Sequence, residues 1–168
     1  LSPVVFFIMS MIIFFFLSYS LTKSKWASLI ASALLAFSPA YLYRTMMGFA
    51  DHDAPGMVAI FACLLIYTLA LTNNKFEKNW KKTIIWGILL GFFTTLTLVS
   101  WGGVITFLLL VIPSSFFLYY LLNSKDKIKA ITFYFIWILS STILPLLFDY
   151  SLREIPGRIL SSYGLLVP

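Results

Sequence analysis

The sequence predicts an all-α fold, a polytopic transmembrane bundle of about six helices. Apolar residues make up 61% of the 168 residues and charged residues only 11%, whereas about a quarter of the residues of an ordinary soluble domain are charged. The uncharged runs match the roughly 20 residues that a helix needs to cross a bilayer. The few charged residues also sort into particular connectors. These three observations exclude a soluble globular domain.

The uncharged runs give the helices in order along the chain. They cover residues 1–22, 26–43, 54–74, 83–123 and 131–148. The fourth run would make roughly 60 Å of helix, about twice the hydrocarbon thickness, so it must fold back on itself. We expect the reversal at Ser100-Trp101-Gly102-Gly103, because paired glycines supply the backbone freedom of a tight turn. The sequence therefore predicts helices at about 3–21, 26–42, 57–73, 83–100, 104–122 and 131–148.

The lysines indicate which way these helices run. All nine follow the first, third or fifth expected helix: Lys23, Lys25, Lys75, Lys78, Lys81, Lys82, Lys125, Lys127 and Lys129. By the positive-inside rule these connectors are cytoplasmic, so the chain starts and ends outside. The net charge of +6 thus reflects orientation in the membrane, and we expect membrane lipids and no nucleic acid as partners.

We expect one domain over residues 1–168, with residues 149–168 starting an external loop. The lone cysteine, Cys63, falls in an apolar run and is expected to be a small buried hydrophobe. The chain opens on the apolar Leu1, with neither an initiator Met nor a basic leader and cleavage site. We therefore expect an internal piece of a longer protein.

One external connector concentrates residues that could carry chemistry. Between the second and third expected helices lie Arg44, Asp51, Asp53 and the chain's one histidine, His52. Carboxylates two residues apart in an extended or turn backbone can reach one ion or share one cation, and such oxygen ligands suit Mg²⁺ or Mn²⁺. His52 is expected to be a polar loop residue, since it projects differently from its two neighbours.

A purely structural alternative explains the same residues. Pro55 and Gly56 fit the start of the third helix, whose free amide groups and positive dipole end would stabilise Asp51 and Asp53 without a metal. Arg44 would then pair with one of the acids. Composition and spacing leave both interpretations open.

Two stretches resemble the catalytic subunit of the oligosaccharyltransferase family. Residues 41–53, Tyr-Leu-Tyr-Arg-Thr-Met-Met-Gly-Phe-Ala-Asp-His-Asp, followed by the apolar residues 57–61, resemble that family's second diacidic motif. Residues 99–103, Val-Ser-Trp-Gly-Gly, followed by an apolar helix with Ile112-Pro113, look like the S-W-G-G element of archaeal and eukaryotic members. The two stretches occur in the family's order, and the D-H-D form favours an archaeal type.

The resemblance implies part of a GT-C type glycosyltransferase membrane domain. Such an enzyme moves an oligosaccharide from a dolichyl or polyprenyl (pyro)phosphate carrier to the Asn side chain of an acceptor polypeptide with an N-x-S/T sequon, on the extracytoplasmic face. The protein would then be a multi-pass protein of an archaeal cell membrane, or of the endoplasmic reticulum membrane in a eukaryote.

The resemblance also implies roles for three residues. The first acid of the motif, which is Asp51 here, ligates the divalent metal, Mg²⁺ or Mn²⁺. The second, Asp53, contributes to the metal site or holds the nearby arginine. Arg44 sits close to the acids and organises the donor side. Together they would form the catalytic group of the fragment, with Asp51 and Asp53 as its metal ligands.

Other parts of the family pattern do not occur in this sequence. No residue is matched to the family's upstream acid in the first external loop or to its further acid in a later external loop, and the W-W-D-Y-G motif of the soluble C-terminal domain does not occur. We therefore expect the fragment alone to be inactive. Two other functions stay open: a different membrane glycosyltransferase that uses a polyprenyl-phosphate sugar, and a membrane transporter. The transporter is disfavoured because the expected helices contain no charge near the midplane.

Overall fold

The computed structural model describes residues 2–45, 53–72, 75–100 and 102–148, and side chains within them at 4–42, 54–72, 75–100 and 107–146. The long helices are α1 (Ser2–Thr22), α4 (Asp53–Leu71), α5 (Trp80–Ser100), α6 (Gly102–Leu122) and α7 (Lys127–Ile143). The shorter elements are α2 (Lys25–Ala36), α3 (Pro39–Thr45) and the 3₁₀ helices η2 (Phe76–Lys78) and η3 (Leu144–Phe148). Every regular element in these ranges is a helix, which confirms the all-α prediction.

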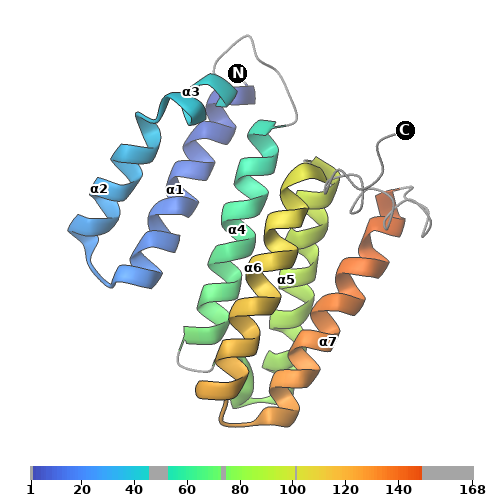
Figure 1. The fold of residues 1–168 in the computed structure, drawn as a ribbon. Helices are drawn as coiled ribbons and strands as arrows, with labels where there is room; N and C mark the ends of the chain where they lie inside the picture. The colour runs from blue at the N-terminus through green and yellow to red at the C-terminus, as the bar shows by residue number, and fades with distance from the viewer. Residues whose placement is uncertain (1, 46–52, 73–74, 101, 149–168) are drawn as a thin grey trace.

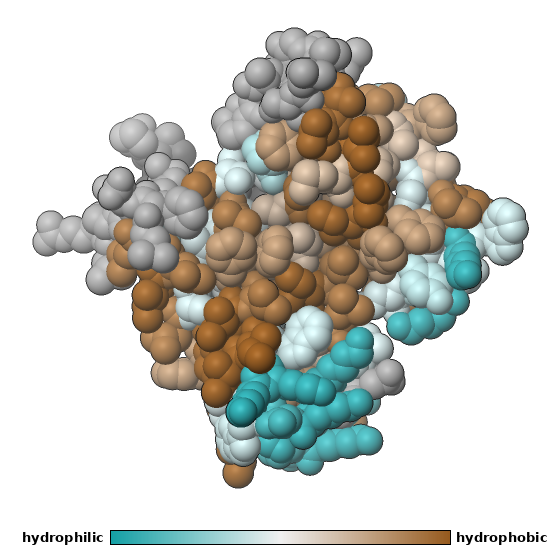
Figure 2. Space-filling model, turned by 180° about the vertical axis from the view of Figure 1, so that it is seen from behind, coloured by the Kyte–Doolittle hydropathy of each residue, from teal (hydrophilic) through white to brown (hydrophobic). Residues whose placement is uncertain are grey.

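The described helices have the length and apolarity of a membrane protein. Four segments are long and apolar enough to cross a bilayer: Val4–Thr22, Ala54–Leu71, Trp80–Ser100 and Lys127–Leu146. Many of their large apolar side chains are exposed, as lipid-facing residues must be in a bundle without its membrane. Figure 2 shows apolar surface across the body of the molecule and hydrophilic residues gathered toward one end. The molecule is therefore a transmembrane helical bundle.

The helix expected over 26–42 is instead two helices, α2 and α3, which corrects the prediction of a single crossing there. The 12 residues of α2 span roughly 18 Å, well short of the hydrocarbon core. The break falls at Phe37 and Ser38, directly before Pro39. Proline lacks an N–H and pushes the residue before it out of the α region, so a helix ends there. The carbonyl of Ser38 then accepts the backbone N–H groups of Tyr41 and Leu42 and starts α3.

The other departures are smaller and also have local causes. The long uncharged run folds back as expected, since α5 ends at Ser100 and α6 begins at Gly102. The last expected helix, 131–148, begins earlier, because Asp126 caps α7 by accepting the backbone N–H of Lys129. It continues past Ile143 as the 3₁₀ helix η3, which contains Pro145. The single-domain prediction with an external loop from 149 stays a prediction, since residues 149–168 lie outside the described ranges.

The packed core lies among α4, α5, α6, α7 and η2. Its largest fully buried side chains include Trp137, Phe76 and Phe133, and the last two stack with ring centroids 4.5 Å apart. Helix α5 packs closely on α7 and α4, while α1 packs on α4 and carries α2 on its outer side. Cys63 is fully buried in this core, in agreement with its expected packing role.

The bundle has two chemically different ends, visible in Figure 1. The lysine end holds the α1–α2, α4–α5 and α6–α7 connectors, and all nine lysines fall at or beside them. The opposite end, here called the motif end, holds α3, the start of α4 and the α5–α6 reversal. Connectors with and without lysines alternate along the sequence, and the fold therefore places the two kinds at opposite ends of the bundle.

Candidate functional site

The two flanks of the acidic motif come together at the motif end. Arg44 lies in the last turn of α3, Asp53 is the first residue of α4, and these two helices contact each other. Asp51 and His52 lie outside the described residues, as do the side chains of Arg44 and Asp53. The backbone thus brings the two helices that carry the motif to one place, and the side-chain geometry of the predicted site stays a prediction.

Helix α3 is fixed against α1 by Tyr41. The Tyr41 side chain is only 2% exposed, and its hydroxyl is hydrogen-bonded to that of Ser10 in α1. The Ser10 hydroxyl in turn donates to the carbonyl oxygen of Phe7 at 2.8 Å, and the Phe7 and Tyr41 rings pack with centroids 5.6 Å apart. Tyr41 therefore sets the position of the helix that bears Arg44, three residues further on.

The start of α4 is held by close packing. Helix α4 begins at Asp53, four residues before the expected start at 57, and contains Pro55 and Gly56 in its first turn. Ala54, Ala59 and Ile60 are buried where α4 packs between α1 and α5. A carboxylate at a helix N-terminus is stabilised by the free amide groups and the helix dipole. The backbone of Asp53 therefore stands at the positive end of the α4 dipole.

The second motif reaches the same end of the bundle. Ser100 closes α5 and Gly102 opens α6, and their junction lies at the motif end (Figure 1). Trp101 lies outside the described residues, as do the side chains of 102–106. Two stretches that are about 50 residues apart in the sequence are thus brought to one end by the antiparallel course of α4 and α5.

The described part of the chain does not contain a ready-made metal centre. No group of three or more His, Cys, Asp and Glu side chains that could hold an ion occurs among the described residues. Asp51 and His52 fall outside them, so the Mg²⁺ or Mn²⁺ prediction is untested. Two carboxylates also supply fewer oxygen donors than the six that Mg²⁺ prefers, so further ligands or waters would be needed.

Sequence reasoning missed a carboxylate at the lysine end, Glu77 in η2. It is 6% exposed and accepts four hydrogen bonds, from the Tyr119 hydroxyl at 3.0 Å, the Ser124 hydroxyl at 2.9 Å and the backbone N–H groups of Lys125 and Asp126 at 3.0 and 3.2 Å. These bonds join the α4–α5 connector to the end of α6 and the start of α7. Its one signal in the sequence was being the single acid among Lys75, Lys78, Lys81 and Lys82.

A second set of polar side chains links helices in the middle of the core. The indole N–H of Trp137 in α7 donates to the Thr94 hydroxyl in α5 at 3.0 Å, and Thr94 donates to the Leu90 carbonyl oxygen. Cys63 in α4 lies 3.5 Å from the same hydroxyl. Such bonds between helices stabilise a transmembrane bundle, in which lipid offers the polar groups no partners. These residues hold the scaffold and lie away from both motifs.

One comparison with known proteins identifies a relationship. The family described as "Oligosaccharyl transferase STT3, N-terminal" matches residues 1–166. No curated protein and no solved structure matches the chain. The match covers nearly the whole chain, including both motifs.

Proposed function

The chain belongs to the STT3 family of oligosaccharyltransferases, and on that premise we propose that it forms the motif-bearing part of a metal-dependent enzyme that glycosylates Asn in N-x-S/T sequons. The donor would be an oligosaccharide on a dolichyl or polyprenyl carrier, and the acceptor a polypeptide that contains the sequon. The observation that carries the proposal is that α3 and α4 bring Arg44 and Asp53 to the end of the bundle that also holds the α5–α6 reversal.

We place the motif end on the extracytoplasmic face. Support comes from the lysine-bearing connectors, all of which lie at the opposite end, and lysine-rich connectors stay on the cytoplasmic side during insertion. The membrane would be the archaeal cell membrane, or that of the endoplasmic reticulum in a eukaryote. The test uses sealed right-side-out vesicles, whose outer surface is the extracytoplasmic face. A cysteine introduced at Thr45 should react with an impermeant maleimide added outside them, and one at Lys127 only after permeabilisation. The reverse pattern would contradict this orientation.

Asp51, Asp53 and Arg44 would act on the donor. The two carboxylates are the right kind of ligand for a hard divalent cation, and such a cation would supply positive charge to the phosphate leaving group. Arg44 would add a permanent charge and a planar set of N–H donors that match phosphate oxygens. Leaving-group charge stabilised in this way lowers the barrier to breaking the sugar–phosphate bond.

The same carboxylates would prepare the acceptor. An amide nitrogen is a weak nucleophile because its lone pair is delocalised into the carbonyl. A carboxylate that accepts hydrogen bonds from the amide N–H groups favours the arrangement in which the nitrogen lone pair is free to attack. This use of Asp51 or Asp53 explains why acids rather than neutral amides would be needed beside the metal.

The test is peptide glycosylation by the complete enzyme with a lipid-linked donor. Asp51→Ala should reduce transfer to an N-x-S/T peptide by about 100-fold or more, and a chelator should stop wild-type transfer until Mn²⁺ or Mg²⁺ is added back. The matched control is Asp126→Ala, which removes an acid at the lysine end and should leave transfer within about twofold. Unchanged transfer in both the Asp51 variant and the chelated enzyme would reject the proposed site.

A further inference from the structure

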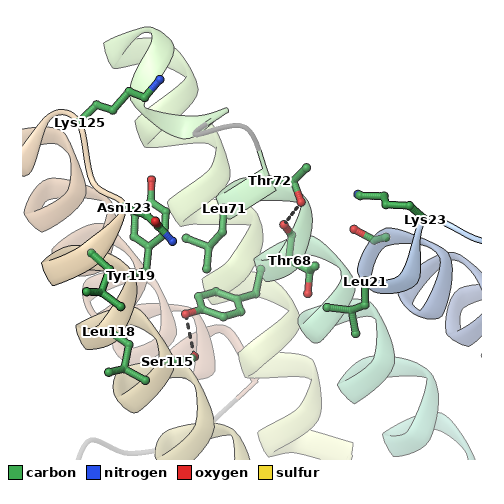
Figure 3. Close-up of a pocket in the computed structure, with 13 residues that line it drawn as sticks. Leu21, Lys23, Thr68, Leu71, Thr72, Ser115, Leu118, Tyr119, Asn123 and Lys125 are labelled. Carbon is green, nitrogen blue, oxygen red and sulfur yellow. Dashed lines mark hydrogen bonds between the residues drawn. The ribbon is translucent and has the colours of Figure 1, made fainter.

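A groove opens at the lysine end, far from the two motifs. It has a volume of about 850 Å³ and lies between the C-terminal ends of α1, α4 and α6 (Figure 3). Its floor and walls combine leucines with hydroxyl-bearing side chains, and a lysine stands at each side of its mouth. This combination of an apolar channel and a charged mouth differs from the uniformly apolar surface of the lipid-facing helices.

The apolar part of the groove suits a hydrocarbon chain. Leu71 of α4 and Leu118 and Leu122 of α6 line it. Leu118 and Leu122 are 58% and 77% exposed, so their surface is open to contact. An acyl chain laid against these leucines would replace contacts that bulk lipid makes only transiently.

The charged part suits an anion. Lys23, after α1, and Lys125, in the α6–α7 connector, line opposite sides of the mouth, and both are exposed. The salt bridge found in the described ranges joins Lys129 and Asp126, and no described carboxylate pairs with Lys23 or Lys125. The buried Glu77 already accepts four hydrogen bonds. Basic pockets between helices at this depth attract phosphate headgroups.

A further feature of the groove is the buried hydroxyl of Ser20. Ser20 of α1 lines it and is 8% exposed, yet among the described residues its hydroxyl is the one buried side-chain atom without a hydrogen-bond partner. By contrast, Thr68 and Thr72 on the facing wall donate to carbonyl oxygens of their own helix at 2.8 Å. The Ser20 hydroxyl is therefore a buried donor whose acceptor is not among the described residues.

The backbone at Lys23 supports a role for its side chain. Lys23 has a φ of 57°, the left-handed conformation that follows many helices and that glycine adopts most easily. Its N–H closes the helix by donating to the Tyr19 carbonyl at 2.9 Å. The turn alone would be served better by glycine, so the lysine contributes charge at a position where the fold does not call for a side chain.

We propose that this groove binds one anionic phospholipid, with its phosphate at the mouth between Lys23 and Lys125 and an acyl chain along Leu71, Leu118 and Leu122. The lipid would fill the space between α1 and α6 and tie the outer layer of α1 and α2 to the core. The site is independent of the proposed catalytic residues, since it lies at the other end of the bundle.

The test measures lipid retention by the complete protein with native mass spectrometry. Protein from mixed phosphatidylglycerol and phosphatidylcholine vesicles of equal chain length should retain one phosphatidylglycerol, with about tenfold preference. Lys23→Gly with Lys125→Gln should reduce that preference to about twofold or less. The matched control, Lys25→Gln with Lys127→Gln, removes two lysines beside the same connectors and should keep it. Lys23→Gly also suits the local backbone, so loss of folding would not explain the result.

Four results would contradict the proposal. Equal loss of preference in the two double variants would show a diffuse charge effect. If millimolar inorganic phosphate displaced the lipid, the groove would be a site for the free anion. A lipid that is also held by its acyl chain should resist such displacement. Absence of any retained lipid in a folded wild-type protein would show that another helix of the complete enzyme fills the groove. Unchanged lipid retention by a Leu118→Gln variant would show that the acyl chain does not lie along these leucines.

Discussion

The two ends of the bundle use the same residue type, a carboxylate, in different surroundings. At the lysine end Glu77 is buried and its oxygens accept four hydrogen bonds from two connectors. At the motif end Asp53 stands at the first residue of α4, opposite the end of α3 that carries Arg44. A carboxylate whose acceptor sites are filled by the protein has a structural role. One at the first residue of a helix stands where the free amide groups and the helix dipole favour negative charge, and we propose that Asp53 uses this position to act on a substrate.

The largest effect on stability is expected from breaking the lysine end. Glu77→Ala would leave the Tyr119 and Ser124 hydroxyls and the partly buried backbone N–H groups of Lys125 and Asp126 without their acceptor. The expected loss in the free energy of unfolding is about 3 kcal/mol, because buried donors that lose a charged partner keep their full desolvation cost. Thermal unfolding of the complete protein in detergent would measure it.

Glu77→Gln serves as the matched control for that loss. It keeps one acceptor oxygen but turns an N–H group toward the remaining donors, so roughly half of the loss should persist. If Glu77→Ala unfolded at the wild-type temperature, the lysine end would not be held by this carboxylate.

A somewhat smaller effect is expected midway between the ends, at Gly91. A Cβ added there would lie 2.7 Å from the Ser140 Cβ and 3.0 Å from the Ser141 backbone nitrogen, so α5 and α7 would have to separate. Gly91→Ala should cost about 1–3 kcal/mol by overpacking. The double variant Gly91→Ala with Ser140→Gly should regain part of that stability, because it removes the nearer obstacle. Equal stabilities of the single variant and wild type would rule out close packing there.

At the motif end, Tyr41→Phe should act locally. It removes the hydroxyl bonded to Ser10 and should cost about 1 kcal/mol, less than Glu77→Ala. Because α3 carries Arg44, peptide transfer should fall several-fold at a temperature where the protein stays folded. An equal loss of transfer in Ser10→Ala would support positioning through this bond, whereas full activity in both variants would show that α3 is placed by other contacts.

The smallest effect concerns Asp126, the cap of α7. Hydrogen bonding from Lys129, whose ammonium lies 2.9 Å away, holds the pKa of Asp126 below its usual value. A lowered folded-state pKa adds stability above the ordinary aspartate pKa and loses it as the pH falls through the lowered value. The melting difference between wild type and Asp126→Asn should thus be constant from pH 7 to 5 and shrink below about pH 4. A melting difference that grows as the pH falls from 5 to 3 would contradict this.

The sequence predicted the bundle well because its signal is collective. Length of the uncharged runs and the placement of lysines each average over many residues, so they gave the course of the helices and the two chemically distinct ends. The prediction of a single helix over 26–42 was wrong because the apolarity of a stretch does not show where its backbone hydrogen bonding is interrupted. Pro39 breaks the hydrogen-bond pattern within an uncharged stretch, and it turns one expected crossing into α2 and α3.

The contacts that define the two ends could not be predicted in the same way. Tyr41 meets Ser10 and Glu77 meets Tyr119 across 31 and 42 residues of sequence, and no spacing rule links residues so far apart. Glu77 stands among four lysines, and a single acid in a basic connector carries no signal of burial. Arg44, Asp51 and Asp53 could be singled out because they lie within ten residues of one another and match a family motif, but that signal carries no side-chain geometry.

The most direct test of the division between the two ends compares Asp51→Asn with Glu77→Gln in one preparation of the complete enzyme. Peptide transfer per folded molecule and the unfolding temperature would be measured for both. We expect Asp51→Asn to lose about 100-fold in transfer with an unchanged unfolding temperature, and Glu77→Gln to unfold at lower temperature with nearly wild-type transfer. Wild-type transfer by Asp51→Asn would contradict the account.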